Sequence, residues 1–200
     1  LSRLVYGIRA TVFLSLLTMA ITSALGACVG LVSGFFRNRI DDVLMRICDV
    51  MMSFPSEVMI LAIVGMTGPG LENVVIANVV AKWPWYARMV RSIVRQYSDK
   101  DYIRFAKVAG GSSIRIMMRH LLPGTAGEFF VLTTLDTGSV ILMISALSFL
   151  GLGVQPPTPE WGMMLNEAKE VMTLYPLQMI PAGMAILLVV AAFNFLGDSL

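Results

Sequence analysis

The sequence predicts an all-α membrane protein, a polytopic bundle of about five transmembrane helices that forms one domain over residues 1–200. Of its 200 residues, 56% are hydrophobic and only 14% are charged, whereas an ordinary soluble domain carries about 25% charged residues. A helix needs about 20 mainly apolar residues to cross the hydrocarbon core of a bilayer. Five segments meet this requirement: 10–36, 43–66, 73–94, 125–150 and 176–196.

The first predicted span carries no charged residue between positions 10 and 36. Gly26, Gly30 and Gly34 recur every four residues within it, which places them on one face of a helix. Small residues at this spacing allow another helix to approach closely. We expect the partner to be a helix of the same bundle, with a subunit interface as the alternative.

The basic residues orient the spans, because cytoplasmic loops are enriched in Lys and Arg. The outer loops, 67–72 and 151–175, contain a single basic residue, Lys169. Arg3 and Arg9 oppose the trend, and we expect that a preceding helix of the full protein fixes the orientation. Eleven of the fifteen basic residues lie on the predicted cytoplasmic side: Arg37, Arg39, Arg46, Arg88, Arg91, Arg95, Lys100, Arg104, Lys107, Arg115 and Arg119.

A basic, amphipathic segment at residues 97–123 separates the third and fourth spans. Gly110-Gly111 divides it into two short helices. In the second helix, Ser112 or Ser113 is placed to cap the start, and Pro123 is expected to end it. The spacing predicts one apolar face, formed by Ile114, Met117, Met118 and Leu121, with Arg115 and Arg119 on the opposite side.

The same segment resembles the loop through which permeases of ABC importers dock on their ATPase. That loop has the pattern Glu-Ala-Ala, three residues, Gly, nine residues, Ile, one residue, Leu-Pro. The present chain is a variant of it, since Arg104 and Phe105 replace the Glu and first Ala, and His120 stands at the Ile position. The resemblance implies coupling to the ATPase through Arg104, Phe105, Ala106, Gly110, Gly111, His120, Leu122 and Pro123. The alternative is an ordinary cytoplasmic loop.

The fourth span contains an acidic residue at membrane depth, Asp136, where a charge costs about 3 kcal/mol on insertion scales. Lining of a polar path and a structural hydrogen-bonding role both remain open for Asp136. Lys82, in the third span, is expected to pair with Glu57 or Glu72. A weakly polar path is predicted along the hydroxyl-bearing face around Asp136, with Thr133, Thr134, Ser145 and Ser148 as its other candidate residues.

The predicted outer loop, residues 151–175, is rich in residues that interrupt helices. Gly151 and Gly153 end the fourth span, and the sequence QPPTPEWG that follows is extended before a helix restarts. Irregular backbone near a membrane must be wet or buried in protein. An outer gate formed by Pro156, Pro157, Pro159 and Trp161 fits this pattern, and so does a passive connector.

Long motifs in family order identify the chain as similar to a permease subunit of the dipeptide, oligopeptide and nickel class of ABC importers. The motifs WPWYARMVRS, TLDTG and PLQM look more similar to the second permease of nickel importers than to peptide permeases. The resemblance to the class covers the whole chain through SRLVYGIRATVFLSL, DVLMRICDVMMSFP, WPWYARMVRSIV, SFLGLGVQPPTPEWGMML and AFNFLGDSL.

This resemblance implies a multi-pass protein of the bacterial or archaeal cytoplasmic membrane that works by alternating access. The implied partners are a second permease subunit in a heterodimer, two ATPase subunits, an extracytoplasmic solute-binding protein and membrane lipid, with no nucleic acid. The implied cargo is nickel or a nickel chelate, or alternatively a dipeptide or oligopeptide.

Other function classes have less support in the residues. The chain has no GxxxxGK[ST] loop, so ATP and Mg would be used by the partner ATPases. It has one His and two Cys, which form no visible catalytic set. We therefore expect a protein that is not an enzyme, with no cofactor and no metal site of its own. An ATPase-independent channel or secondary transporter that uses Asp136 and Lys82 for ion coupling is a more distant alternative.

Overall fold

The computed structural model describes residues 2–199, and every regular element among them is helical. This confirms the predicted all-α class. In chain order the elements are α1 (Ser2–Phe36), α2 (Arg39–Met52), α3 (Ser56–Thr67), α4 (Leu71–Ser98), α5 (Asp101–Val108), α6 (Ser113–Ile116), the π-helical turn η1 (Met117–Leu121), α7 (Leu122–Phe149), α8 (Trp161–Glu170), the 3-10 turn η2 (Pro176–Met179) and α9 (Ile180–Asp198).

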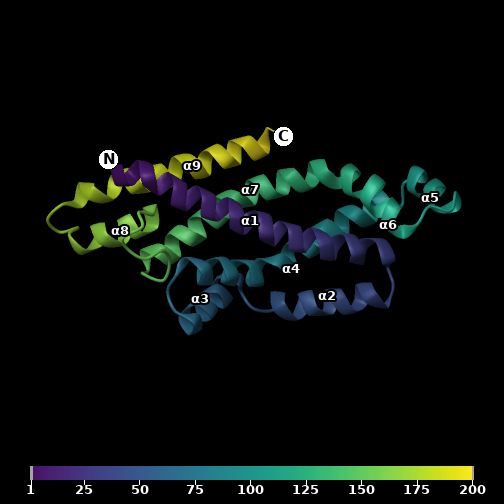
Figure 1. Ribbon diagram of the computed structural model, residues 1–200, viewed down its shortest axis with the longest axis horizontal. Helices are drawn as coiled ribbons and strands as arrows, with labels where there is room; N and C mark the ends of the chain where they lie inside the picture. The colour runs from purple at the N-terminus through teal and green to yellow at the C-terminus, as the bar shows by residue number, and fades with distance from the viewer. Residues whose placement is uncertain (1, 200) are drawn as a thin grey trace.

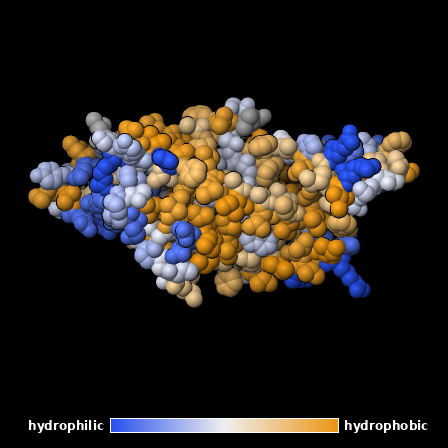
Figure 2. Space-filling model, viewed as in Figure 1, coloured by the Kyte–Doolittle hydropathy of each residue, from blue (hydrophilic) through white to orange (hydrophobic). Residues whose placement is uncertain are grey.

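The helices form an elongated bundle in which α1, α4 and α7 run lengthwise (Figure 1). The segment at 97–123, with α5 and α6, lies at one end, and the outer loop with α8 lies at the other. Figure 2 shows an apolar band across the middle of the molecule and polar residues towards both ends. This distribution suits a protein whose middle lies in hydrocarbon and whose two ends meet water.

Within residues 2–199, three helical stretches are long and apolar enough to cross a membrane, namely Ser2–Phe36, Ser113–Phe149 and Pro176–Asp198. The expected span at 43–66 is not one straight helix. It is divided into α2 and α3, which meet at an angle of 78°. The break lies at Ser53–Pro55, where proline lacks the N–H that would continue the helix. If this bent pair counts as one span, the number rises to four.

The remaining expected span corresponds to α4, which has 28 residues but is too polar to be counted with the others. Its charged residues are Glu72, Lys82, Arg88, Arg91 and Arg95. Much of α4 is buried inside the bundle, including Asn78, Tyr86 and Val94. A helix that is shielded by its neighbours can carry charges that a lipid-facing helix cannot.

The glycine repeat of α1 packs against α4 of the same chain, as predicted. A Cβ atom on Gly26 would lie 2.2 Å from the Cβ of Tyr86, and one on Gly30 would lie 2.6 Å from the carbonyl oxygen of Ala87. One on Gly34 would lie 2.8 Å from a methyl carbon of Val94. The two helices therefore approach too closely for any larger residue at these positions.

Ion pairs join α1, α2 and α4 at the end of the bundle that carries α5 and α6. The carboxylate of Asp41 is buried and accepts hydrogen bonds from Arg91 Nε at 2.6 Å and Nη2 at 2.8 Å, and also from Arg95 and Ser33. Arg37 donates to both carboxylate oxygens of Asp99, at 2.9 and 3.0 Å. These hydrogen bonds from Arg37 hold the pKa of Asp99 below its ordinary value.

Candidate functional site

The segment at 97–123 forms a fixed turn between α5 and α6. Gly110 has φ = +80°, a conformation that suits glycine. The N–H of Gly111 donates to the carbonyl of Ala106 at 3.0 Å, and that of Gly110 donates to the carbonyl of Lys107 at 3.1 Å. These two bonds form a Schellman motif, which satisfies the last carbonyls of α5. The hydroxyl of Ser112 accepts from the N–H of Arg115 at 3.4 Å, so the predicted cap is confirmed.

The expectation that Pro123 ends the second helix is wrong. The chain continues from α6 through η1 into α7, and Pro123 lies in the first turn of α7. In η1 the N–H of Leu122 donates to the carbonyl of Met117, five residues earlier. This wider turn shifts the hydrogen-bond register just before the proline, whose missing N–H is then tolerated. A continuous helical stretch therefore links the exposed loop to the interior of the bundle.

The predicted apolar face of the second helix is also partly wrong. Met117 and Leu121 are buried, as expected, together with Ile116. Ile114 and Met118 instead are exposed, at 70% and 57%. Burial at 116, 117 and 121 follows the π-helical turn, which breaks the regular period on which the prediction depended.

The four most exposed apolar side chains of this segment lie at the polar end of the molecule (Figure 2). Phe105 and Val108 of α5 are 75% and 86% exposed, beside the exposed Ile114 and Met118. Four basic residues lie close to them in the sequence: Arg104, Lys107, Arg115 and Arg119. We call Phe105, Val108, Ile114 and Met118 the loop patch. Of the other predicted coupling residues, Leu122 and Pro123 are exposed, and Ala106, Gly111 and His120 are half-buried.

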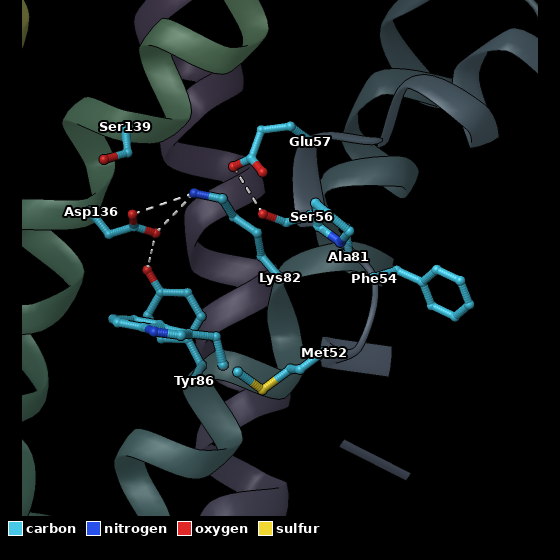
Figure 3. A pocket seen from close by; sticks show the side chains of 11 residues that line it. Met52, Phe54, Ser56, Glu57, Ala81, Lys82, Tyr86, Asp136 and Ser139 are labelled. Carbon is cyan, nitrogen blue, oxygen red and sulfur yellow. Dashed lines mark hydrogen bonds and ion pairs between the residues drawn. The ribbon is translucent and has the colours of Figure 1, made fainter. Parts of the chain in front are cut away.

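A cavity of about 530 Å³ lies at the junction of α3, α4 and α7 (Figure 3). Asp136 of α7 lines it, as do Lys82 and Tyr86 of α4. The ammonium group of Lys82 lies 3.4 Å from both carboxylate oxygens of Asp136. The hydroxyl of Tyr86 donates to Oδ2 of Asp136 at 2.5 Å. The other lining residues are Met52, Phe54, Pro55, Ser56, Glu57, Ala81, Trp85 and Ser139.

The expected partner of Lys82 was therefore wrong, since its ion pair is with Asp136 rather than with Glu57 or Glu72. Glu57 nevertheless lines the same cavity, where its carboxylate accepts a hydrogen bond from Ser56 at 2.9 Å. Sequence reasoning missed Tyr86 and Ser139 altogether. Their signal was the spacing, because Lys82 and Tyr86 are four residues apart on α4, and Asp136 and Ser139 are three apart on α7.

The other predicted path residues lie away from this cavity. The hydroxyls of Thr133 and Thr134 donate to the carbonyl of Phe130 in their own helix, at 2.9 and 2.8 Å. Ser148 is buried and accepts a hydrogen bond from the N–H of Val154 at 3.3 Å. Ser145 is buried where its backbone contacts α8, since a Cβ on Gly162 would lie 2.2 Å from the Ser145 carbonyl oxygen. Asp136 alone of the five predicted residues lines the cavity.

The outer loop is anchored to α1 at the start of α8. The ring N–H of Trp161, which is 1% exposed, donates to the carbonyl of Leu4 at 2.9 Å. The buried carboxylate of Glu160 accepts from the hydroxyl of Thr11 at 3.0 Å and from the N–H of Met163 at 2.9 Å. By contrast, Pro156 and Pro157 are exposed, and Pro159 is half-buried.

A second link between α1 and α8 lies nearby. Arg3 and Glu167 form a bidentate ion pair with distances of 2.6 and 2.8 Å. The hydrogen bond from Arg3 holds the pKa of Glu167 below its ordinary value. Trp161 is therefore a fixed anchor in this conformation, whereas Pro156 and Pro157 lie in an exposed segment just before it.

Among residues 2–199 no three His, Cys, Asp or Glu residues are grouped so that they could hold a metal ion. A helix bundle with a charged cavity inside and a polar loop at each end has the construction of a membrane transporter subunit.

Comparison with known proteins defines the family. The chain belongs to the family of binding-protein-dependent transport system inner membrane components, which matches residues 26–200. It is therefore a permease subunit of an ABC importer of the inner membrane. Its whole length is 42% identical to the metal-staphylopine import system permease protein of Staphylococcus aureus, strain Mu50, of which it covers 69%.

Two other relatives and one solved structure extend the comparison. The chain is 37% identical to the nickel transport system permease protein of Escherichia coli K12, with 100% of this chain and 72% of the relative covered. It is 40% identical to a di/tripeptide transport system permease protein of Pseudomonas aeruginosa, with 100% and 66% covered. A chain of the MetNI methionine ABC transporter has the same fold, with a TM-score of 0.81 at 16% identity, covering 100% of this chain and 94% of that one.

Substitution of Asp136 by Asn tests the ion pair inside the cavity. The change leaves the ammonium of Lys82 without its counter-charge. We expect the free energy of unfolding to fall by about 2 kcal/mol, less than the ~3–5 kcal/mol of a fully enclosed pair, because the cavity is partly open. Thermal unfolding of the purified protein in detergent measures this.

Two further variants make that result specific. The double variant Lys82→Met with Asp136→Asn removes both members of the ion pair together and should recover most of the lost stability. Asp198→Asn removes an exposed carboxylate at the end of α9 and should unfold like the unaltered protein. An Asp136→Asn protein as stable as the unaltered one would show that the pair contributes nothing to the fold.

Proposed function

We propose that this chain forms half of the translocation path for nickel or a nickel chelate in an ATP-driven importer. The identity to the metal-staphylopine permease, 42%, and to the nickel permease, 37%, supports this cargo. A dipeptide or oligopeptide is the second candidate, because the identity to the di/tripeptide permease is 40% and that to a glutathione transport system permease of Pectobacterium atrosepticum is 38%. The chain would have the same role, half of the translocation path, with either cargo.

In this proposal the chain pairs with a second permease subunit in the lipid bilayer and works with two ATPases and an extracytoplasmic binding protein. ATP and Mg are bound by the ATPases. The family membership supports such partners, and so does the exposure of the loop patch. Exposed apolar side chains among basic residues are typical of a protein-binding surface. The loop patch, together with Arg104, Ala106, Gly110, Gly111, His120, Leu122 and Pro123, is the proposed docking surface for one ATPase.

The proposed path passes through the cavity at the junction of α3, α4 and α7. A polar cavity inside an apolar bundle is where a hydrophilic cargo can cross at least cost. Of the predicted path residues, Asp136 is central to this proposal, and Thr133 and Thr134 remain candidates within one turn before it on α7. Ser145 and Ser148 are also kept as candidates and lie further along α7, where both side chains are buried.

The outer gate is proposed at Pro156, Pro157 and Pro159, with Trp161 as the anchor on which this segment is hinged. The exposed prolines stiffen the segment, and the contacts of Trp161 and Glu160 with α1 fix its end. Movement of α1 relative to α7 would then change the position of the proline segment. The remaining alternative is a passive connector.

Replacement of Gly110 by Val tests the coupling role of the loop. A β-branched residue is strongly disfavoured at φ = +80°, so the turn between α5 and α6 should distort. We expect the importer, reconstituted in vesicles, to keep hydrolysing ATP while its transport rate falls several-fold. The control is Ala109→Val, one residue earlier, where φ is −69° and valine is tolerated. Normal transport by the Gly110→Val importer would remove this turn from the coupling mechanism.

Uptake by the reconstituted importer with its binding protein tests the cargo. We expect ATP-dependent, saturable uptake of radioactive nickel, free or chelated. Saturable dipeptide uptake without nickel uptake in either form would move the chain to the peptide branch. That result would leave the fold and the coupling proposal intact.

A further inference from the structure

The cavity contains three charged side chains, each supplied by a different helix. Lys82 comes from α4, Asp136 from α7 and Glu57 from the first turn of α3. Figure 3 shows the ammonium of Lys82 between the two carboxylates, and the Glu57 carboxylate points towards it. The side chains of Lys82 and Asp136 are 16% and 19% exposed, so both are mostly shielded from bulk solvent and still accessible from the cavity.

Lys82 is loosely held compared with Asp136. Its ammonium is 3.4 Å from both oxygens of Asp136, whereas a charge-assisted N–H···O bond is usually about 2.7–2.9 Å long. Asp136 receives its short hydrogen bond, 2.5 Å, from Tyr86 instead. An ammonium has three N–H donors, and among residues 2–199 the hydrogen bonds of Lys82 go to Asp136 alone. Lys82 can therefore bind an additional acceptor that enters the cavity.

A bare metal dication is poorly matched to this arrangement. The two carboxylates attract a cation, but they lie on either side of the Lys82 ammonium (Figure 3), so a bare dication bound between them would lie against a fixed positive charge. The two carboxylates could not offer a full ligand set, since no group of three potential metal ligands is present among residues 2–199. A carboxylate, by contrast, is attracted by Lys82, and an ammonium or other cationic part of the same molecule is attracted by Glu57 and Asp136.

We propose that Lys82 is a specificity-determining residue that pairs with a carboxylate of the cargo, while Glu57 and Asp136 face its cationic part. The cargo is then an amino-acid-like zwitterion or a metal complex of one, rather than a hydrated metal ion. This inference rests on the proposed function, because it assumes that cargo passes through this cavity. It also narrows that function from nickel in either form to nickel carried by a carboxylate-bearing chelator.

The test compares two probes in vesicles that contain the complete importer and its binding protein. One probe is radioactive nickel alone, and the other is radioactive nickel with an excess of L-histidine, which supplies carboxylate and amine groups. The ratio of the two uptake rates is measured on the same vesicles, so it does not depend on how much importer has assembled. Stimulation of ATP hydrolysis by the binding protein is recorded in parallel as a measure of intact assembly.

We expect the unaltered importer to take up the nickel–histidine complex faster than nickel alone. In the Lys82→Met importer the ratio of the two uptake rates should fall about tenfold, which corresponds to about 1.4 kcal/mol. Lys82→Arg keeps the charge and should keep most of the preference. Lys169→Met is the matched control, because it removes an exposed ammonium from α8, outside the cavity. An unchanged ratio in Lys82→Met, or equal uptake of nickel alone and of the complex by the unaltered importer, would overturn the inference.

A second variant covers the case in which Lys82→Met does not assemble. Lys82→Met combined with Asp136→Asn removes the pair without leaving an unpaired charge, and it should lose the preference to the same extent. If this double variant keeps the preference, Lys82 does not determine specificity.

Failure of the proposed cargo gives a different result. An importer that takes up neither nickel probe but takes up dialanine refutes nickel as cargo, while the inference about Lys82 is then tested on the dipeptide, which also carries a carboxylate and an amine. Loss of dialanine uptake in the double variant, with binding-protein-stimulated ATP hydrolysis preserved, would support the inference. Unchanged dialanine uptake would overturn it.

Discussion

The close approach of α1 and α4 is the constraint on which the other features depend. Gly26, Gly30 and Gly34 allow the two backbones to meet without intervening side chains. This contact buries Tyr86 against α1, where its hydroxyl also lies 3.4 Å from the sulfur of Met19. With Tyr86 fixed, both Lys82 one turn earlier and the carboxylate of Asp136 are held in the cavity. The buried carboxylate of Asp41 ties the same two helices, through Ser33, Arg91 and Arg95, at the other end of the contact.

The second helix that matters is the stretch from α6 to α7, because it connects the two candidate sites. Ile114 and Met118 of the loop patch lie at its start, and Asp136 lies further along the same continuous helix. A displacement imposed on the loop by a partner would therefore be transmitted along a rigid element to the cavity. The turn at Gly110 and the buried residues Ile103, Ile116 and Leu121 fix the loop to this helix. Coupling in this account needs no further element of the chain.

The sequence was sufficient for those features that depend on local pattern. Hydrophobicity and charge predicted the all-α membrane class, and the glycine repeat predicted the α1 contact with another helix of the bundle. Other features depend on contacts between helices, and the periodicity of a sequence does not show which helices pack together. The ion pair of Lys82 with Asp136 could not be predicted without knowing that α4 packs against α7. The bend between α2 and α3 was missed because the sequence on both sides of it is apolar. Pro123 was misleading because a π-helical turn accommodates it, and that turn also moved Ile114 and Met118 to the surface.

The central claim is that the cavity of α3, α4 and α7 lies on the transport path and changes its accessible side during the cycle. Thiol labelling at Ser139→Cys, in a chain whose Cys28 and Cys48 are replaced by Ala, measures this most directly, because position 139 lines the cavity. In the assembled importer, a membrane-impermeant reagent should react from the cytoplasmic side without nucleotide and from the outer side with a non-hydrolysable ATP analogue. Equal reactivity in both states, or the absence of reaction from either side, would contradict the account.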